Sequence, residues 1–158
     1  MIGRCGWIGA AMLLLSAAPA TAQDRHEGYY YPPPQSAETY TARVTTLPDS
    51  GRARRIGFVT VLTQQLLAAR YAPTYAIFAK GAEAEKLIIV GLADGQLNSL
   101  YRARALFATL TAVARLTQFF RDNTLADEAT FFDLLKLLGF SQVTITDGAS
   151  FAHQVLIE

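Results

Sequence analysis

The amino-acid sequence predicts an α+β domain: a mostly antiparallel sheet of four to five strands with three helices packed on one face, in the order β-α-β-β-α-α-β-β. Short apolar or alternating runs that are typical of strands lie close enough in pairs to form hairpins. Longer segments with apolar residues three and four positions apart indicate helices between them. The chain has 158 residues, of which 136 follow a predicted signal peptide, and this length suits one domain over residues 39–158.

The first 22 residues predict export. Arg4 precedes an apolar run from Ile8 to Ala18, and Ala20-Thr21-Ala22 offers the small residues that a signal peptidase accepts. The apolar run is shorter than the ~20 residues that a membrane-spanning helix needs. We therefore expect a signal peptide over residues 1–22 that is cleaved after Ala22, a periplasmic or secreted product, and no stable membrane anchor.

The charge balance disfavours some classes of partner. The chain has 14 basic and 13 acidic residues, and removal of Arg4 with the signal peptide leaves 13 of each. A nucleic-acid-binding protein needs a basic surface to displace counterions, so the balanced mature chain predicts no nucleic-acid partner. The single cysteine, Cys5, lies in the signal peptide, so we expect no disulfide in the mature domain.

Residues 23–38 form a predicted arm that is rich in tyrosine and proline. Tyr29, Tyr30 and Tyr31 run directly into Pro32-Pro33-Pro34. Three prolines cannot donate ladder hydrogen bonds and favour polyproline II. Because tyrosine combines a large apolar ring with a polar hydroxyl, we expect a contact surface here. The arm is a candidate binding site for a partner and a candidate cover for the free face of the sheet.

The first half of the domain predicts one strand, one helix and a hairpin. Residues 39–47 alternate in polarity and form the first strand, which ends at the turn 48–51. A helix is expected over 54–70 because apolar residues recur there at helical spacing. Strands over 74–79 and 86–92 are joined by a linker short enough for an antiparallel hairpin.

The second half predicts two helices and a second hairpin. A long helix is expected over 97–121 and a shorter one over 127–138, which ends at Gly139. The predicted inner stripe of the long helix consists of Leu106, Leu110, Val113, Thr117 and Phe120. Strands over 142–146 and 152–157 complete the sheet, with Asp147-Gly148 as the turn between them.

His153 offers one hypothesis for nucleophilic catalysis. A serine hydrolase needs a histidine base oriented by a carboxylate, and Asp147 and Ser150 are near His153 in the sequence. All three lie within seven residues on one predicted hairpin, which leaves few groups to form an oxyanion hole. The alternative is a histidine on a strand face beside two turn residues.

Paired carboxylates are a second catalytic hypothesis, since glycoside hydrolysis uses two of them. The candidates are Asp94, Asp127 and Asp133, although Asp133 also fits the polar side of an amphipathic helix. The spacing of histidine, cysteine and acidic residues predicts no metal site, and no motif implies a cofactor.

Arg52, Arg54 and Arg55 cluster at a predicted helix N-terminus. Fixed positive charge there opposes the helix dipole, so a chain that accepts this cost can use the site to hold an anion. The hypothesis is a small anionic ligand or a partner docked on these arginines. The alternative is a solvated loop in which the arginines pair with Asp49 or Glu38.

Three strings support a family resemblance. They are His-Glu-Gly-Tyr-Tyr-Tyr-Pro at 26–32, Tyr-Ala-Ile-Phe-Ala-Lys-Gly at 75–81, and Phe-Phe-Asp-Leu-Leu-Lys-Leu-Leu-Gly-Phe at 131–140. Together they resemble a family of small exported proteins of Gram-negative bacteria that are sometimes labelled molybdopterin-guanine dinucleotide biosynthesis protein A. The resemblance covers most of the mature chain and implies an accessory role linked to molybdenum-cofactor proteins. The glycine-rich Leu-Ala-Gly-Gly loop of the nucleotidyltransferase with that name has no counterpart here, so no site residue transfers.

These observations together favour an exported, non-catalytic binding or accessory protein. Its expected partner is an unidentified protein or a small anionic ligand, contacted by the tyrosine-proline arm and the arginine cluster. The alternatives are an exported hydrolase or transferase that uses carboxylates or His153, and an accessory factor for molybdenum-cofactor proteins.

Overall fold

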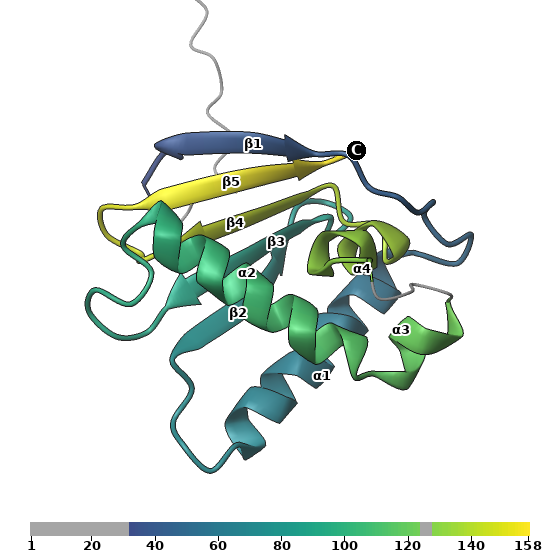
Figure 1. The fold of residues 1–158 in the computed structure, drawn as a ribbon, viewed down its shortest axis with the longest axis horizontal. Helices are drawn as coiled ribbons and strands as arrows, with labels where there is room; N and C mark the ends of the chain where they lie inside the picture. Colours follow the sequence, from purple (N-terminus) through teal and green to yellow (C-terminus); the bar gives the residue numbers. More distant parts are fainter. Residues whose placement is uncertain (1–31, 124–127) are drawn as a thin grey trace, which may run out of the picture.

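A computed structural model describes residues 32–123 and 128–158, which fold into a sheet with helices on one side (Figure 1). The elements are β1 (Ser36–Tyr40), α1 (Arg52–Ala68), β2 (Tyr75–Lys80), β3 (Lys86–Gly91), α2 (Leu100–Arg115), α3 (Gln118–Asp122), α4 (Phe131–Leu137), β4 (Gln142–Thr146) and β5 (Ala152–Ile157). Within the described ranges, no helix has both the length and the hydropathy that crossing a membrane requires.

The five strands are arranged in the order β1-β5-β4-β3-β2. The two predicted hairpins, β2–β3 and β4–β5, are antiparallel. Parallel pairing joins β3 to β4 and β1 to β5, so the sheet is mixed. The predicted α+β class and the predicted sheet of four to five strands are confirmed, with five strands present in the described residues.

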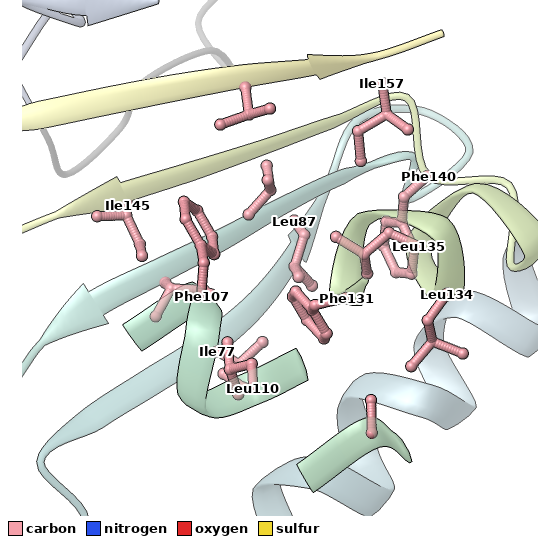
Figure 2. Packing of buried hydrophobic residues seen from close by; sticks show 14 of the residues in the cluster. Ile77, Leu87, Phe107, Leu110, Phe131, Leu134, Leu135, Phe140, Ile145 and Ile157 are labelled. Carbon is pink, nitrogen blue, oxygen red and sulfur yellow. The ribbon is translucent and has the colours of Figure 1, made fainter. Parts of the chain in front are cut away.

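One face of the sheet forms the core. Because side chains alternate along a strand, the register places Leu87, Val143 and Val155 in one row on the same face. Ile89 and Ile145 form the next row, and all five residues belong to a single buried cluster. Side chains from α1, α2, α3 and α4 pack against this cluster, as Figure 2 shows for several of them. The helices therefore cover this face, as expected.

The predicted helix over 97–121 is two helices. It is interrupted at Leu116 and Thr117, where the Thr117 hydroxyl accepts a hydrogen bond from the Phe120 amide at 3.2 Å and starts α3. The buried side chains of α2 are Ala103, Phe107, Leu110 and Ala114, whereas Val113 is exposed. The predicted inner stripe was therefore wrong except at Leu110, Phe120 and the half-buried Leu106.

The first strand begins earlier than predicted and ends at Tyr40. Its pairing with β5 is parallel, and the Gln35 amide already donates to the Ala152 carbonyl at 2.9 Å. The Ala42 amide still donates to the Glu158 carbonyl at 2.7 Å, but the chain after it leaves the ladder and ends against α4: the Leu47 amide donates to the Leu137 carbonyl, and the Thr46 hydroxyl donates to the Lys136 carbonyl. The last residues of the predicted arm, 36–38, therefore belong to the sheet.

Candidate functional site

His153 lies on the helix-covered side of β5, opposite Ser36 in the parallel register with β1. Its side chain is buried. Nε2 is 3.2 Å from Glu38 Oε1, and Nδ1 is 2.8 Å from Ser36 Oγ. Because a carboxylate only accepts hydrogen bonds, Nε2 must donate to Glu38, and in the neutral tautomer Nδ1 accepts from the Ser36 hydroxyl.

Arg104 completes this group, which we call the His153 cluster: Ser36, Glu38, Arg104 and His153. The Arg104 guanidinium on α2 donates to Glu38 Oε2 at 2.9 Å. Burial raises the pKa of Glu38, but the hydrogen bonds from Arg104 and His153 outweigh it and hold the pKa below its ordinary value. The cluster joins β1, β5 and α2.

The catalytic hypothesis of Asp147, Ser150 and His153 is not supported by the structure. Asp147 accepts hydrogen bonds from the backbone amides of residues 149–151 and from the Ser150 hydroxyl within its own turn. These bonds outweigh the small effect of burial and lower the pKa of Asp147 to about 2. His153 faces Ser36 and Glu38 instead, so the hypothesis of an Asp147-Ser150-His153 set is wrong, and the alternative, a histidine on a strand face beside two turn residues, is what the structure has.

The His153 cluster has the order hydroxyl, imidazole, carboxylate that nucleophilic hydrolases use. Glu38 fixes the tautomer of His153, and Nδ1 is then free to take the proton of Ser36. The sequence suggests this group only in part: Ser36 and Glu38 are two residues apart and so share a strand face, but the parallel pairing that brings them to His153 has no local sequence pattern.

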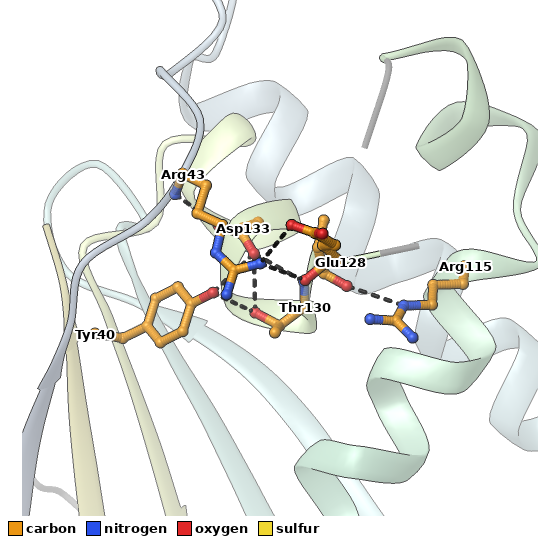
Figure 3. A network of polar contacts seen from close by, with 7 residues as sticks. Tyr40, Arg43, Arg115, Glu128, Thr130 and Asp133 are labelled. Carbon is orange, nitrogen blue, oxygen red and sulfur yellow. Dashed lines mark hydrogen bonds and ion pairs between the residues drawn. The ribbon is translucent and has the colours of Figure 1, made fainter. Parts of the chain in front are cut away.

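A second polar network surrounds Asp133 (Figure 3). The carboxylate is fully buried and accepts from the Tyr40 hydroxyl, the Arg43 amide and the Thr130 amide, each at 2.8 Å. Burial raises the pKa of Asp133, but the two backbone amides and the hydroxyl outweigh it, so the net shift is downward. The interpretation of Asp133 as the solvent side of a helix was therefore wrong. This network ties the chain after β1 to the start of α4.

Arg55 is buried and points inward from α1. Its guanidinium donates to four carbonyl oxygens: Nε to Glu83 at 2.9 Å, and Nη1 to Ser50 at 3.1 Å, to Gly139 at 3.2 Å and to Leu138 at 3.5 Å. Burial of a guanidinium is compatible with stability when its donors are satisfied in this way. Arg55 therefore connects α1, the loop after β2 and the end of α4.

The other two arginines of the predicted cluster point elsewhere. Arg54 forms a bidentate ion pair with Asp49, one bond of which, from Nη1 to Oδ1, measures 2.7 Å. This is one of the pairings expected from the sequence, whereas Glu38 pairs with Arg104. Arg52 is exposed at the first position of α1. The three guanidiniums do not converge on one point, and the anion hypothesis stays a prediction.

Several predicted site residues cannot be placed. Tyr29, Tyr30, Tyr31 and Asp127 lie outside the described residues. Asp94 is exposed in the loop after β3. Among the residues that the structure describes, no three histidine, cysteine or acidic side chains group as a metal site would require.

Apolar side chains exposed on α1, among uncharged polar ones, are a feature that the sequence analysis missed. Ile56, Val61 and Leu67 are exposed on α1, and Tyr71 is exposed just after it. Leu67 is 69% exposed and Tyr71 is 77% exposed. No residue from Ile56 to Ala69 is charged, and that uncharged run is the sequence pattern that could have revealed this surface. We call these four residues the α1 outer face.

Comparison with models of known families, with curated proteins and with solved structures finds no match for this chain. A function for the chain is therefore inferred from the geometry of its own residues.

Proposed function

We propose that the protein is an exported, non-catalytic binding or accessory protein that contacts another protein through the α1 outer face. The observation that supports this is a helix with apolar residues packed on the core and further apolar residues exposed among uncharged polar ones. Phe58, Leu62 and Leu66 pack on the core, while Ile56 and Leu67 are exposed on the opposite side. A surface helix normally has a polar outer side, and exposed apolar groups gathered on one face mark interaction sites.

The charges around the α1 outer face specify the chemistry of the partner. Helix α1 contains arginines and no acidic residue, and Arg70 lies two residues after its last residue. Arg52 and Arg70 are both exposed, one at each end of the uncharged run. A complementary surface has an apolar stripe flanked by carboxylates, because opposite charges at the rim steer association and set its register. In this way Arg52 keeps the contact role expected of it.

The test is native mass spectrometry of the chain purified gently from the periplasm of its own host. The variant is Leu67→Glu, and the matched control is Tyr101→Glu, because Tyr101 is 84% exposed on α2. We expect a partner polypeptide on the wild type and the control, and its loss from Leu67→Glu, with all three chains folded by circular dichroism. If the partner is a molybdoenzyme, the accessory role implied by the family resemblance follows as well.

Three results would contradict this proposal. They are a bare monomer for the wild type, a partner retained by Leu67→Glu, and a pair of identical chains that Leu67→Glu separates. The third would make the α1 outer face a self-association surface.

The His153 cluster favours a second candidate function, an exported hydrolase with Ser36 as nucleophile and His153 as base. The supporting observation is the chain of contacts from Ser36 through His153 to Glu38. A panel of chromogenic esters and phosphoesters tests it. Turnover that Ser36→Ala and His153→Gln both abolish, in folded protein, would support the hydrolase. Turnover unaffected by Ser36→Ala would exclude it.

A further inference from the structure

The solvent side of α2 has an apolar stripe where a surface helix normally carries polar residues. Phe107 and Leu110 are buried on the core side of this helix, and the opposite side is exposed. Tyr101 is 84% exposed at the start of that side, and Leu116 is 76% exposed at its end. We call the exposed, uncharged residues that recur there at three- and four-residue spacing the α2 outer face: Tyr101, Ala105, Ala108, Ala112 and Leu116. In Figure 1, α2 lies in front of the sheet with no other labelled helix in front of it.

The α2 outer face offers few groups for directional hydrogen bonds. Thr109 borders it, but its hydroxyl donates to the Ala105 carbonyl of the same helix at 3.0 Å. The α1 outer face differs, because Gln64 and Gln65 are exposed among its apolar residues. Their amides need hydrogen-bond partners, which a protein surface supplies and a lipid layer does not. The α2 outer face can enter an apolar layer without leaving polar side chains unsatisfied.

Arginines flank the α2 outer face. Helix α2 contains Arg102, Arg104 and Arg115 and no acidic residue, and all three arginines are exposed. Each residue of a helix turns the direction of its side chain by about 100°. Arg104 and Arg115 therefore lie along one flank of the α2 outer face, and Arg102 lies along the other. An arginine stem can rest on an apolar surface while its guanidinium reaches a charged layer beside it.

The positive charge beside the α2 outer face is only partly neutralised. Glu38 pairs with Arg104 at 2.9 Å. Arg115 donates through Nε to the uncharged carbonyl of Ala129 at 3.0 Å. Within residues 32–123 and 128–158, neither Arg102 nor Arg115 pairs with a carboxylate. The whole chain has a net charge of only +1, so this is a local separation of charge.

This combination of stripe and charge fits an anionic lipid surface. A bilayer with anionic lipids presents phosphate groups directly above an apolar layer, and helices with an apolar stripe and basic flanks lie in that interface. Tyrosine suits the same depth, because its ring is apolar and its hydroxyl is polar. A second copy of this chain fits poorly, since the same stripe facing itself would bring arginines against arginines.

We propose that the α2 outer face binds the surface of an anionic membrane reversibly. Tyr101 and Leu116 enter the interface at the two ends of the helix, and Arg102 and Arg115 contact phosphate groups. The contact is peripheral, because only one side of α2 takes part and its other side remains in the core. This inference goes beyond the proposed function, which concerns α1 and a protein partner.

Vesicle binding with matched variants tests the proposal. The protein is mixed with vesicles of phosphatidylglycerol and phosphatidylcholine in equal parts, or of phosphatidylcholine alone, and the bound fraction is measured by sedimentation. The variants are Leu116→Glu and the double change Arg102→Gln with Arg115→Gln. The matched control is Leu67→Glu on α1, because Leu67 is 69% exposed and Leu116 is 76% exposed. Circular dichroism checks that every chain is folded.

We expect the wild type and Leu67→Glu to bind the anionic vesicles and to bind phosphatidylcholine alone far more weakly. Each arginine near an anionic surface contributes roughly a five-fold gain in affinity, so the double arginine variant should bind more than about ten-fold more weakly. Leu116→Glu should lose binding as well, because it places a carboxylate in the apolar layer. Raising the salt concentration should release the wild type.

Four results would overturn the proposal. They are no binding of the wild type to anionic vesicles, binding that Leu116→Glu retains, equal affinity for phosphatidylcholine alone, and equal loss of binding in Leu67→Glu. Native mass spectrometry adds a fifth: a polypeptide that Leu116→Glu loses and Leu67→Glu keeps would make the α2 outer face a protein contact. Because the α1 partner is read out separately, either proposal can fail without the other.

A fluorescence measurement locates the contact directly. Trp7 is the only tryptophan in the sequence, so a Trp7→Phe background accepts a single reporter. Leu116→Trp places the reporter on the α2 outer face, and Leu67→Trp places it on the α1 outer face. With brominated phosphatidylglycerol in the vesicles, we expect quenching and a blue shift for Leu116→Trp and neither for Leu67→Trp. Equal quenching in both variants, or none in either, would contradict the proposal.

Discussion

Arg55 illustrates how a residue in a charged cluster can be structural. Its guanidinium donates to carbonyls of Ser50, Glu83 and Gly139, which come from three separate loops. Planar geometry and several fixed donors allow arginine to bind such scattered acceptors, which lysine cannot do in the same way. Arg54 is its neighbour in sequence and yet forms only a surface ion pair with Asp49.

This difference predicts unequal effects of the same substitution. Arg55→Met is expected to lower the free energy of unfolding by about 2 kcal/mol, because the partly buried carbonyls that it binds lose a charged donor. Arg54→Met should cost less than about 1 kcal/mol, as surface ion pairs do. Urea unfolding measures both. Equal effects would mean that the contacts of Arg55 do not stabilise the fold.

At the scale of elements, α4 is defined at both ends by residues outside its own apolar stripe. Asp133 binds the Thr130 amide at its start. Gly139 follows its last turn with a φ of +79°, a conformation that favours glycine. A Cβ on Gly139 would lie 2.6 Å from Arg55 Nη1 and 3.0 Å from Ser50 Oγ. Backbone conformation and crowding therefore both require glycine here.

Two glycine substitutions should consequently act in opposite directions. Gly139→Ala is expected to destabilise the protein by at least about 1 kcal/mol, because the left-handed backbone is strained and Arg55 must move. Gly57→Ala in α1 meets no atom within 4 Å and should stabilise by up to about 1 kcal/mol through helix propensity. Thermal unfolding compares them. If Gly57→Ala destabilised the protein instead, the expected room for a Cβ at position 57 of α1 would be contradicted.

The sequence predicts elements well where the pattern is local. Strands β4 and β5 have the predicted bounds, and β2 and β3 differ by one residue at most at each end. The split between α2 and α3 was missed because Leu116 and Thr117 do not break an apolar stripe. Residues 41–47 alternate like a strand, but the chain leaves the ladder after Ala42, and α4 supplies the hydrogen-bond partners of Thr46 and Leu47.

The contacts within the candidate sites could be predicted less well, because they join residues that are far apart in the sequence. His153 and Glu38 were both noticed, but their contact depends on β1 pairing with a strand more than 100 residues later. The buried state of Asp133 likewise depends on Tyr40 and Arg43, which approach from the other end of the chain. Long-range pairing of this kind leaves no periodic pattern in the sequence.

At the scale of the whole molecule, three carboxylates make folding stability depend on pH in the same direction. Glu38, Asp133 and Asp147 all have folded pKa values below their ordinary values. Their stabilising effect is fully present above the unfolded pKa, near 4, and is lost as pH falls through the folded values. For Asp147 the loss extends from about pH 4 down to about 2.

Urea unfolding between pH 7 and pH 2 should therefore show stability falling steadily below about pH 4. The variant Asp147→Asn should be less stable than the wild type at neutral pH and should lose less stability on acidification. The two curves should converge near pH 2, where Asp147 of the wild type is half protonated. Curves that stay parallel over the whole range would contradict a role for the Asp147 turn in acid sensitivity.

The pairing of β1 with β5 also determines when the fold can form. β1 comes first among the described strands, but its partner β5 lies more than 100 residues further along the chain. During synthesis β1 therefore has no native neighbour until β5 has been made. The complete sheet forms only after that point, and contacts of such high sequence separation slow folding. Until then the edge of β1 is unpaired and exposed. A chaperone that shields strand edges would therefore need to bind β1 for longer than the other strands.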